Sequence, residues 1–407
     1  MIRILNYRDA QSLIQRKTVR LEQAERIVAP ILADVRDRGD AALLDYARKF
    51  DRYDGSTVRV PISGSLEPDF LKAAQVAATN IREYAREQLP KEWFIDFPDG
   101  RRLGQIVRPI DAMGAYVPAG RYPLPSTVLM TVIPAQVAGV QTTCIACPHP
   151  SAEILGLAHF LGVTHMFQMG GAQAIAAFAY GTETVPKVDR IVGPGNIYVA
   201  AAKKLIAGET GIDFVAGPTE IVIIAADGNP RWIAADLLAQ AEHDVDASSI
   251  LLTTSRALAE AVALEVDRQL ETLPTAHVAR PSIDGNGAIV VVDSLEQAVE
   301  MSNNLAPEHL ALHEGRLLNQ IRHAGAVFVG PQSTEAAGDY ASGPNHVLPT
   351  SGAARQRGGL SAADFVKVIA VQELTRAGLS ALTPAIAKLA RAEGLEGHAR
   401  SAEVRDE

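Results

Sequence analysis

The sequence is poor in cysteine, in aromatic residues and in positive charge. It has two cysteines, and aromatic residues make up 5% of its 407 residues. Two cysteines cannot form a disulfide framework, so we expect a protein of the reducing cytoplasm. Cys144 and Cys147 lie in an apolar segment and are expected to be core residues on opposite faces of a strand. Lys and Arg number 38 against 47 Asp and Glu. This balance argues against nucleic acid as the main partner, because phosphate binding needs a cationic surface.

Long apolar runs are also absent. No stretch reaches the ~18 apolar residues needed to span a bilayer, and the first residues lack the apolar segment of a secretory signal. We therefore expect neither a membrane nor a nucleic acid as partner. The sequence does have the composition of a globular protein, with 47% hydrophobic and 21% charged residues. Its length is typical of two or three domains.

The apolar pattern changes near residue 105. Before this point, residues 21–50 and 71–89 have apolar residues at helical spacing, with a helix break at 37–40. After it, short apolar runs alternate with alanine-rich helical segments. The runs expected to form strands are 143–147, 164–169, 190–192, 220–225, 250–253, 288–292 and 326–329. This alternation predicts βαβ units, a mainly parallel sheet and the α/β class. The segment from 361 onward is expected to be helical.

Two strand-to-helix turns are candidate ligand sites, because ligands of open α/β sheets bind beyond the carboxyl ends of the strands. These turns are 169–173 and 192–196. Their glycines would let the backbone approach a ligand at a helix N-terminus. Neither turn matches the dinucleotide fingerprint Gly-x-Gly-x-x-Gly. The residues alone leave open whether the turns bind a nucleotide or only connect a strand to a helix.

Two polar pairs are candidates for metal binding or acid–base chemistry. Gln240 and His243 share a face of the helix expected over 232–244, and both can bind Zn²⁺. From these two residues alone, a hydrogen-bonded interior pair is the favoured explanation. Glu308 and His309 follow a helix-breaking proline and are expected on a turn. Adjacent Glu and His suit acid–base catalysis, although such pairs are also common on solvated loops.

Further polar residues lie toward the C-terminus. The segment 337–346 contains Asp339 and His346, which are candidate ligands or bases unless the segment is only a structural loop. Glu393 and His398 lie in the C-terminal segment, where a histidine is usually solvated.

Taken together, these segments resemble the histidinol dehydrogenase family. They occur in the family's order and cover nearly the whole chain. Several are seven or more residues long, such as Asp-Leu-Leu-Ala-Gln-Ala-Glu-His at 236–243. The matching segments are 114–118, 122–130, 170–177, 187–189, 192–196, 212–213, 216–220, 236–243, 306–310, 338–340 and 345–350.

The resemblance implies a zinc- and NAD-dependent oxidation of L-histidinol to L-histidine through L-histidinaldehyde, using two NAD⁺. This is the last step of histidine biosynthesis. Zinc would be bound by Gln240, His243, Asp339 and His398. Glu308 and His309 would form the acid–base pair. Substrate would contact the zinc ligands together with Thr219, His309 and Glu393, for which Glu396 is the alternative. NAD would contact Tyr116, Gln173 and Asn196.

The resemblance also implies two incomplete Rossmann-like units in a homodimer with shared active sites. Residues 1–15 would form an N-terminal arm. Residues 16–115 and 220–360 would form the first unit, and 116–219 would form a second unit inserted into it. Residues 361–407 would be a helical segment that reaches the active site of the partner subunit.

Two other functions stay open at this point. Relatives with the same zinc and NAD machinery oxidise other small polar alcohols, such as sulfonated diols, and the pocket around Thr219, His309 and Glu393 would decide the substrate. A regulatory module that binds a nucleotide or a metal is the other alternative, because function resides in the site and not in the fold. The Glu308–His309 pair argues against such a module, since a pure binding protein needs no acid–base pair.

Overall fold

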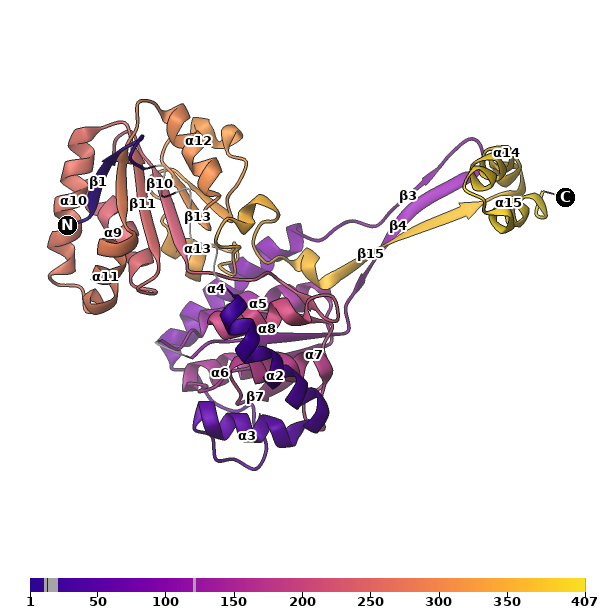
Figure 1. Ribbon diagram of the computed structural model, residues 1–407, viewed down its shortest axis with the longest axis horizontal. Coiled ribbons are helices and arrows are strands. Elements are labelled where there is room, and N and C mark those ends of the chain that lie inside the picture. Colours follow the sequence, from indigo (N-terminus) through magenta and orange to yellow (C-terminus); the bar gives the residue numbers. More distant parts are fainter. Residues whose placement is uncertain (11–12, 14–20, 120–121, 407) are drawn as a thin grey trace.

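The computed structural model describes residues 1–10, 13, 21–119 and 122–406. In this part, the chain forms two six-stranded α/β units and a projecting arm (Figure 1). None of its helices is both long and apolar enough to cross a membrane. The predicted α/β class with parallel-rich sheets is confirmed.

Sheet I is parallel throughout, with the strand order β1-β12-β11-β10-β13-β14. Its strands are β1 (Arg3–Asn6), β10 (Glu220–Ile224), β11 (Ser248–Thr253), β12 (Ala288–Val291), β13 (His309–Leu312) and β14 (Ala326–Val329). One face is covered by α9 (Pro230–Ala241), α10 (Arg256–Leu270) and α11 (Ala276–Asn286), and the other by α12 (Leu295–Leu305). Burial on both faces explains why the central strands are continuous apolar runs.

Sheet II has the order β2-β7-β6-β5-β8-β9 and is parallel except at β2. Its strands are β2 (Arg59–Val60), β5 (Ala112–Tyr116), β6 (Thr142–Ala146), β7 (His165–Phe167), β8 (Arg190–Val192) and β9 (Gly211–Ile212). One face is covered by α2 (Glu22–Arg38), α3 (Asp40–Asp51), α7 (Gly171–Tyr180) and α8 (Ile197–Ile206). The other face is covered by α4 (Pro68–Glu87), α5 (Ser126–Ala138) and α6 (Ala152–Phe160). Cys144 and Cys147 are buried in the cores on opposite faces, as predicted.

The arm is a three-stranded antiparallel ribbon that carries two helices. Its strands are β3 (Trp93–Asp96), β4 (Arg101–Pro109) and β15 (Val366–Leu374), and β4 pairs with β15 over nine residues. Figure 1 shows the arm extending away from both sheets, with α14 (Arg376–Ala392) and α15 (Glu396–Glu403) at its tip. The helices predicted after 361 are therefore present, but the prediction missed β15. Most of its residues are exposed, so the strand lacks the buried apolar run that marks the sheet strands.

The predicted division into units is wrong for the N-terminal hundred residues. Residues 16–115 were expected to join 220–360, yet α2, α3 and α4 pack on sheet II. In contrast, β1 of the expected N-terminal arm is an edge strand of sheet I. Helical periodicity shows which face of a helix is buried but not which sheet buries it, so the sequence could not decide this point. The boundary expected at 15/16 lies outside the described residues.

Candidate active site

Polar side chains gather at the amino edge of sheet I. Thr219 precedes β10, and His309 is the first residue of the neighbouring strand β13. Helix α9 follows β10 and runs back, so its last turn brings Gln240 to the same edge. The prediction that His309 lies on a turn is wrong, because β13 is paired from its first residue with both β10 and β14.

The Glu308 carboxylate is buried and tied to the start of β10. Its Oε2 atom accepts hydrogen bonds from the Thr219 hydroxyl at 2.5 Å and from the Glu220 backbone N–H at 2.9 Å. Burial raises the pKa of Glu308 to about 7, although His309 and the Thr219 hydroxyl oppose this rise. A carboxyl group with a pKa near neutrality can both take up and release a proton, as acid–base catalysis requires.

His309 lies among three carboxylates. Its Nδ1 atom is 3.6 Å from Glu335 Oε1 and 3.7 Å from Glu308 Oε2, and its Nε2 atom is 3.4 Å from Asp339 Oδ1. Burial alone would lower the pKa of His309, but these carboxylates outweigh it and raise the pKa to about 10. Nε2 is buried, and Asp339 is the carboxylate that it faces. The ring stacks on Phe328, with the two centroids 6.0 Å apart.

The Gln240 side chain links these groups. With its nitrogen turned toward Glu335, the Gln240 amide donates to Glu335 Oε1 at 2.6 Å, lies 3.2 Å from His309 Nδ1, and places its oxygen 2.5 Å from the Thr219 hydroxyl oxygen. The single hydrogen of the Thr219 hydroxyl is donated either to this oxygen or to Glu308 at any one time. We adopt this orientation because the opposite one would face the amide oxygen toward the Glu335 carboxylate. A continuous polar chain therefore runs from Glu308 through Thr219 and Gln240 to Glu335.

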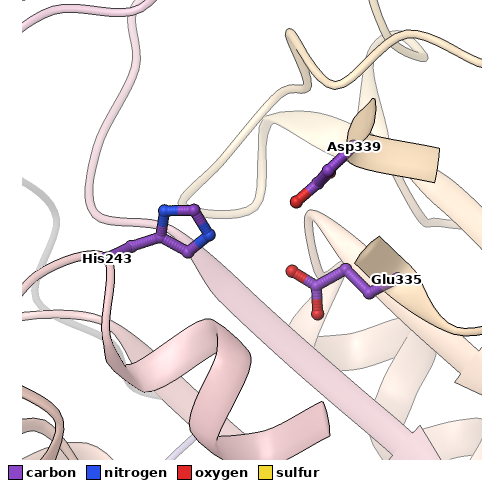
Figure 2. A group of neighbouring side chains, drawn as sticks. All are labelled: His243, Glu335 and Asp339. Carbon is purple, nitrogen blue, oxygen red and sulfur yellow. The ribbon is translucent and has the colours of Figure 1, made fainter. Parts of the chain in front are cut away.

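His243, Glu335 and Asp339 form a possible metal-binding cluster (Figure 2). Each offers one ligand atom, and these atoms all lie within 4.8 Å of one another. Imidazole nitrogen and carboxylate oxygen are donors that suit Zn²⁺. The pKa of Glu335 is raised to about 8 by burial and by the neighbouring Asp339 and Glu308. Three buried carboxylates surround one imidazole, so a bound cation would supply further compensating positive charge.

Sequence reasoning missed Glu335. It lies on α13 (Glu335–Tyr340), four residues before Asp339, so the two carboxylates share one helical face. The segment that drew attention for its polar residues began at 337 and stopped short of it. The Glu-x-x-x-Asp spacing was the available signal.

The three residues expected to contact NAD lie at the carboxyl edge of sheet II. Tyr116 ends β5, Gln173 lies in the first turn of α7 after β7, and Asn196 caps α8 after β8. The Tyr116 hydroxyl accepts a hydrogen bond from the Gly171 N–H at 3.1 Å. Residues 213–219 lead directly from the end of β9 to the start of β10, so the two edges are within a short connection of each other.

The sequence model of the histidinol dehydrogenase family matches residues 14–406. The chain belongs to this family. The histidinol dehydrogenase of Geobacillus kaustophilus is 49% identical over 399 residues, covering 94% of each chain. That of Halalkalibacterium halodurans is 47% identical and covers 99% of each chain. The crystal structure of histidinol dehydrogenase from Elizabethkingia anophelis matches with a TM-score of 0.94 at 38% identity, covering 99% of this chain and 98% of that one.

Membership of the histidinol dehydrogenase family makes the chain an oxidoreductase of histidine biosynthesis. The hypothesis of a regulatory binding module is therefore not supported. The expected family residues are brought together only in part within one chain. Gln240, His243 and Asp339 lie in one group, whereas Glu393 caps the C-terminus of α14 and His398 lies in α15, at the tip of the arm (Figure 1). Glu396 is engaged by Arg391 and Arg400 on the arm itself.

Proposed function

We propose that the chain oxidises L-histidinol to L-histidine through L-histidinaldehyde, reducing two NAD⁺. The observation that carries this proposal is the buried Glu308–His309 pair beside the cluster of His243, Glu335 and Asp339. An acid–base pair beside a metal-type donor set is what a metal-assisted alcohol oxidation needs. The relatives at 49% and 47% identity carry the name histidinol dehydrogenase, and none of those compared supports the sulfonated-diol alternative.

Each residue has a distinct task in this reaction. His309, in its neutral form, takes the hydroxyl proton as the first hydride leaves. A bound cation would favour that form by offsetting the carboxylates that raise the pKa of His309. Glu308 then activates the water that hydrates the aldehyde, with its proton exchange supported by the Thr219 hydroxyl. A second hydride transfer from the hydrate gives the carboxylate. Holding the aldehyde in the buried site between the two steps protects a reactive intermediate.

Zinc is the proposed metal, bound by Gln240, His243 and Asp339 of one chain and by His398 of the partner subunit. When bound, it would orient the substrate and supply positive charge that offsets the surrounding carboxylates. The Gln240 amide needs its own support to serve as a ligand, and the hydrogen bond to Glu335 supplies it.

NAD is proposed to bind at the carboxyl edge of sheet II, in contact with Tyr116, Gln173 and Asn196. This edge is where open α/β sheets bind nucleotides. The chain from β9 to β10 brings it close to the amino edge of sheet I, where the substrate would sit. A cytoplasmic location stays a prediction.

A homodimer is proposed to complete the site. The arm places Glu393 and His398 away from the site of their own chain, and its ribbon exposes Trp93, Ile95 and Val368. An exposed apolar ribbon is the kind of surface that a second copy would cover. Mixing the inactive variants His309→Ala and His398→Ala tests this arrangement. Hybrid dimers with one intact site would regain activity, whereas no recovery would place both residues in one chain.

The decisive experiment is to count NADH formed per L-histidinol consumed, with zinc present. Two NADH per substrate, abolished by a chelator and restored by zinc, would establish the four-electron reaction and the metal together. No turnover of L-histidinol by protein that still binds zinc and NAD⁺ would refute the proposed substrate. Sulfonated diols would be the next substrates to test.

A further inference from the structure

Asp51 lies behind the proposed nucleotide edge and has no role in the reaction described above. It is the last residue of α3 and is 7% exposed. Its Oδ2 atom accepts two hydrogen bonds, from the Gly170 backbone N–H at 2.9 Å and from Gln173 Nε2 at 3.2 Å. Both donors belong to the turn and first helical turn that follow β7.

Without these two hydrogen bonds, an ionised Asp51 carboxylate would be unfavourable at this position. A carboxylate at the C-terminal end of its own helix faces the negative end of the helix dipole. Burial also raises the pKa of Asp51, while the Gly170 N–H and the Gln173 amide lower it. The start of α7 therefore supplies the compensation, because its free N–H groups favour a negative group.

The two bonds fix how Gln173 presents its amide. Because Oδ2 accepts from two donors, the nitrogen end of the Gln173 amide must face Asp51. The oxygen end is then turned toward the turn at Gly171, where a Cβ would meet it at 2.9 Å. The next N–H of the turn, that of Gly171, is taken by the Tyr116 hydroxyl. Asp51 and Tyr116 thus accept from the N–H groups of the N-cap residue and of the first residue of α7.

We propose that Asp51 is a positioning residue for the nicotinamide nucleotide. It holds the Gly170–Gly171 turn and sets the Gln173 amide with its oxygen directed away from α3. This inference rests on the proposed binding of NAD at Tyr116, Gln173 and Asn196.

Helix α3 also contains a residue that serves as a matched control. Asp40, at the other end of α3, accepts hydrogen bonds from the Thr182 hydroxyl at 2.5 Å and the Thr184 hydroxyl at 3.1 Å. These residues follow α7, whereas Gly170 precedes it. Asp51 therefore accepts hydrogen bonds at the N-terminus of α7, and Asp40 accepts them from residues that follow its C-terminus. Only Asp51 lies at the proposed nucleotide edge.

The test is NAD⁺ binding to the zinc-loaded dimer by calorimetry, together with thermal unfolding. Asp51→Ala removes the acceptor of two hydrogen bonds and is expected to raise the Kd for NAD⁺ about tenfold, the equivalent of one lost hydrogen bond. Asp51→Asn retains a carbonyl oxygen that can replace Oδ2, so it is expected to restore most of the affinity. Asp40→Ala is expected to lower the Tm but to leave the Kd for NAD⁺ unchanged.

Gln173→Ala separates this inference from the proposed function. If Gln173→Ala weakens NAD⁺ binding while Asp51→Ala does not, the positioning role of Asp51 is refuted and the nucleotide site stands. If neither variant changes the Kd, both the nucleotide site and the inference fail. The proposal would also be overturned if Asp51→Ala and Asp40→Ala raised the Kd for NAD⁺ equally and in proportion to the fall in their Tm values. Asp51 would then have only a general structural role.

Discussion

Sheet II places its candidate ligand residues at the carboxyl ends of its strands, and sheet I places them at the amino ends. On sheet II, Tyr116 ends β5 and Asn196 follows β8, as expected for an open α/β sheet. On sheet I, Thr219 and Glu308 lie just before β10 and β13. The rule that ligands bind beyond the carboxyl ends of parallel strands therefore locates the candidate residues of sheet II but not those of sheet I. Two sheets joined by a short connection can bring unlike edges together, which suits a reaction between a nucleotide and a second substrate.

The strands β10 and β13 repeat this contrast on a smaller scale. At their amino ends, Glu308 accepts a hydrogen bond from the Glu220 N–H at 2.9 Å. At their carboxyl ends, Glu314 accepts one from the Ala226 N–H at 2.7 Å. Both carboxylates lie beside β13 and bond to the backbone near β10. Only Glu308 also contacts the Thr219 hydroxyl and His309. Glu308 and Glu314 therefore have similar backbone contacts but different side-chain neighbours.

The largest expected effect comes from Glu308→Gln. Loss of the proton-exchanging group should lower kcat ~10²–10⁴-fold, with NAD⁺ binding unchanged because the nucleotide residues lie at the edge of the other sheet. Steady-state kinetics and NAD⁺ titration measure both quantities. Glu314→Gln is the matched control and should retain kcat close to the original value. Equal losses for the two variants would remove the functional contrast between the ends of β10 and β13.

The second prediction concerns the buried ion pair behind the carboxyl edge of sheet II. Lys203 Nζ lies 2.6 Å from Asp213 Oδ1 and donates to the Gly193 carbonyl at 2.6 Å, while Asp213 Oδ2 accepts from the Gly193 N–H at 2.8 Å. Lys203→Met leaves Asp213 buried and without its cation, so it should reduce the free energy of unfolding by about 3–5 kcal/mol. Urea unfolding measures this loss.

The neighbouring Lys204 provides the control for that prediction. It pairs with Glu25 at 2.6 Å, but its side chain is half exposed. Lys204→Met should therefore cost under about 1 kcal/mol. Zinc content of Lys203→Met protein that remains folded should be unchanged, since the proposed ligands belong to sheet I and the arm. A loss of zinc would show that the two edges are mechanically coupled.

Parts of this arrangement could be predicted from the sequence, and the reason differs from element to element. The strands β8 and β14 were predicted with their observed bounds, because each is a short apolar run set off by polar residues or glycine. β13 was missed because it begins with a polar residue, His309, directly after a proline and a glutamate. β15 was missed because most of its residues are exposed. Local pattern thus identifies short apolar runs and misses strands that contain or begin with polar or exposed residues.

The candidate site shows the same limit. Gln240, His243 and Asp339 were proposed from family motifs, and the fold brings them together with Glu335, which no motif contained. Their proximity depends on α9 running back to the amino edge of sheet I and on α13 following β14, which spacing along the chain does not reveal. In one chain's fold His398 lies in α15 at the tip of the arm, so its proposed place in the site requires a second copy of the chain.

A third prediction tests whether Glu335 supports the metal ligands. Glu335→Gln replaces an acceptor of the Gln240 amide by a group that can present a donor. Groups that orient metal ligands typically change metal affinity 10–100-fold (~1.4–2.8 kcal/mol). We expect zinc affinity, measured by competition with a chromogenic chelator, to fall in this range, and NAD⁺ affinity to stay constant. Unchanged zinc affinity would limit Glu335 to its contact with His309.

The smallest expected effect is a change in the pH dependence of stability. Burial raises the pKa of Glu308 from 4.5 to about 7. Because the folded state has the higher pKa, the stabilisation from this group is complete below pH 4.5 and is lost as the pH rises through 7. Glu308→Gln cannot undergo this loss.

In metal-free protein, Glu308→Gln should therefore gain stability relative to the original chain between about pH 5 and about pH 8, by at most about 1.4 kcal/mol per pH unit. Urea unfolding across this range after treatment with a chelator measures the difference. Parallel pH curves for the two proteins would mean that Glu308 is ionised in the folded state throughout. Its carboxylate would then act at the amino edge of sheet I only as a fixed acceptor for Thr219 and Glu220, and proton exchange would fall to His309 alone.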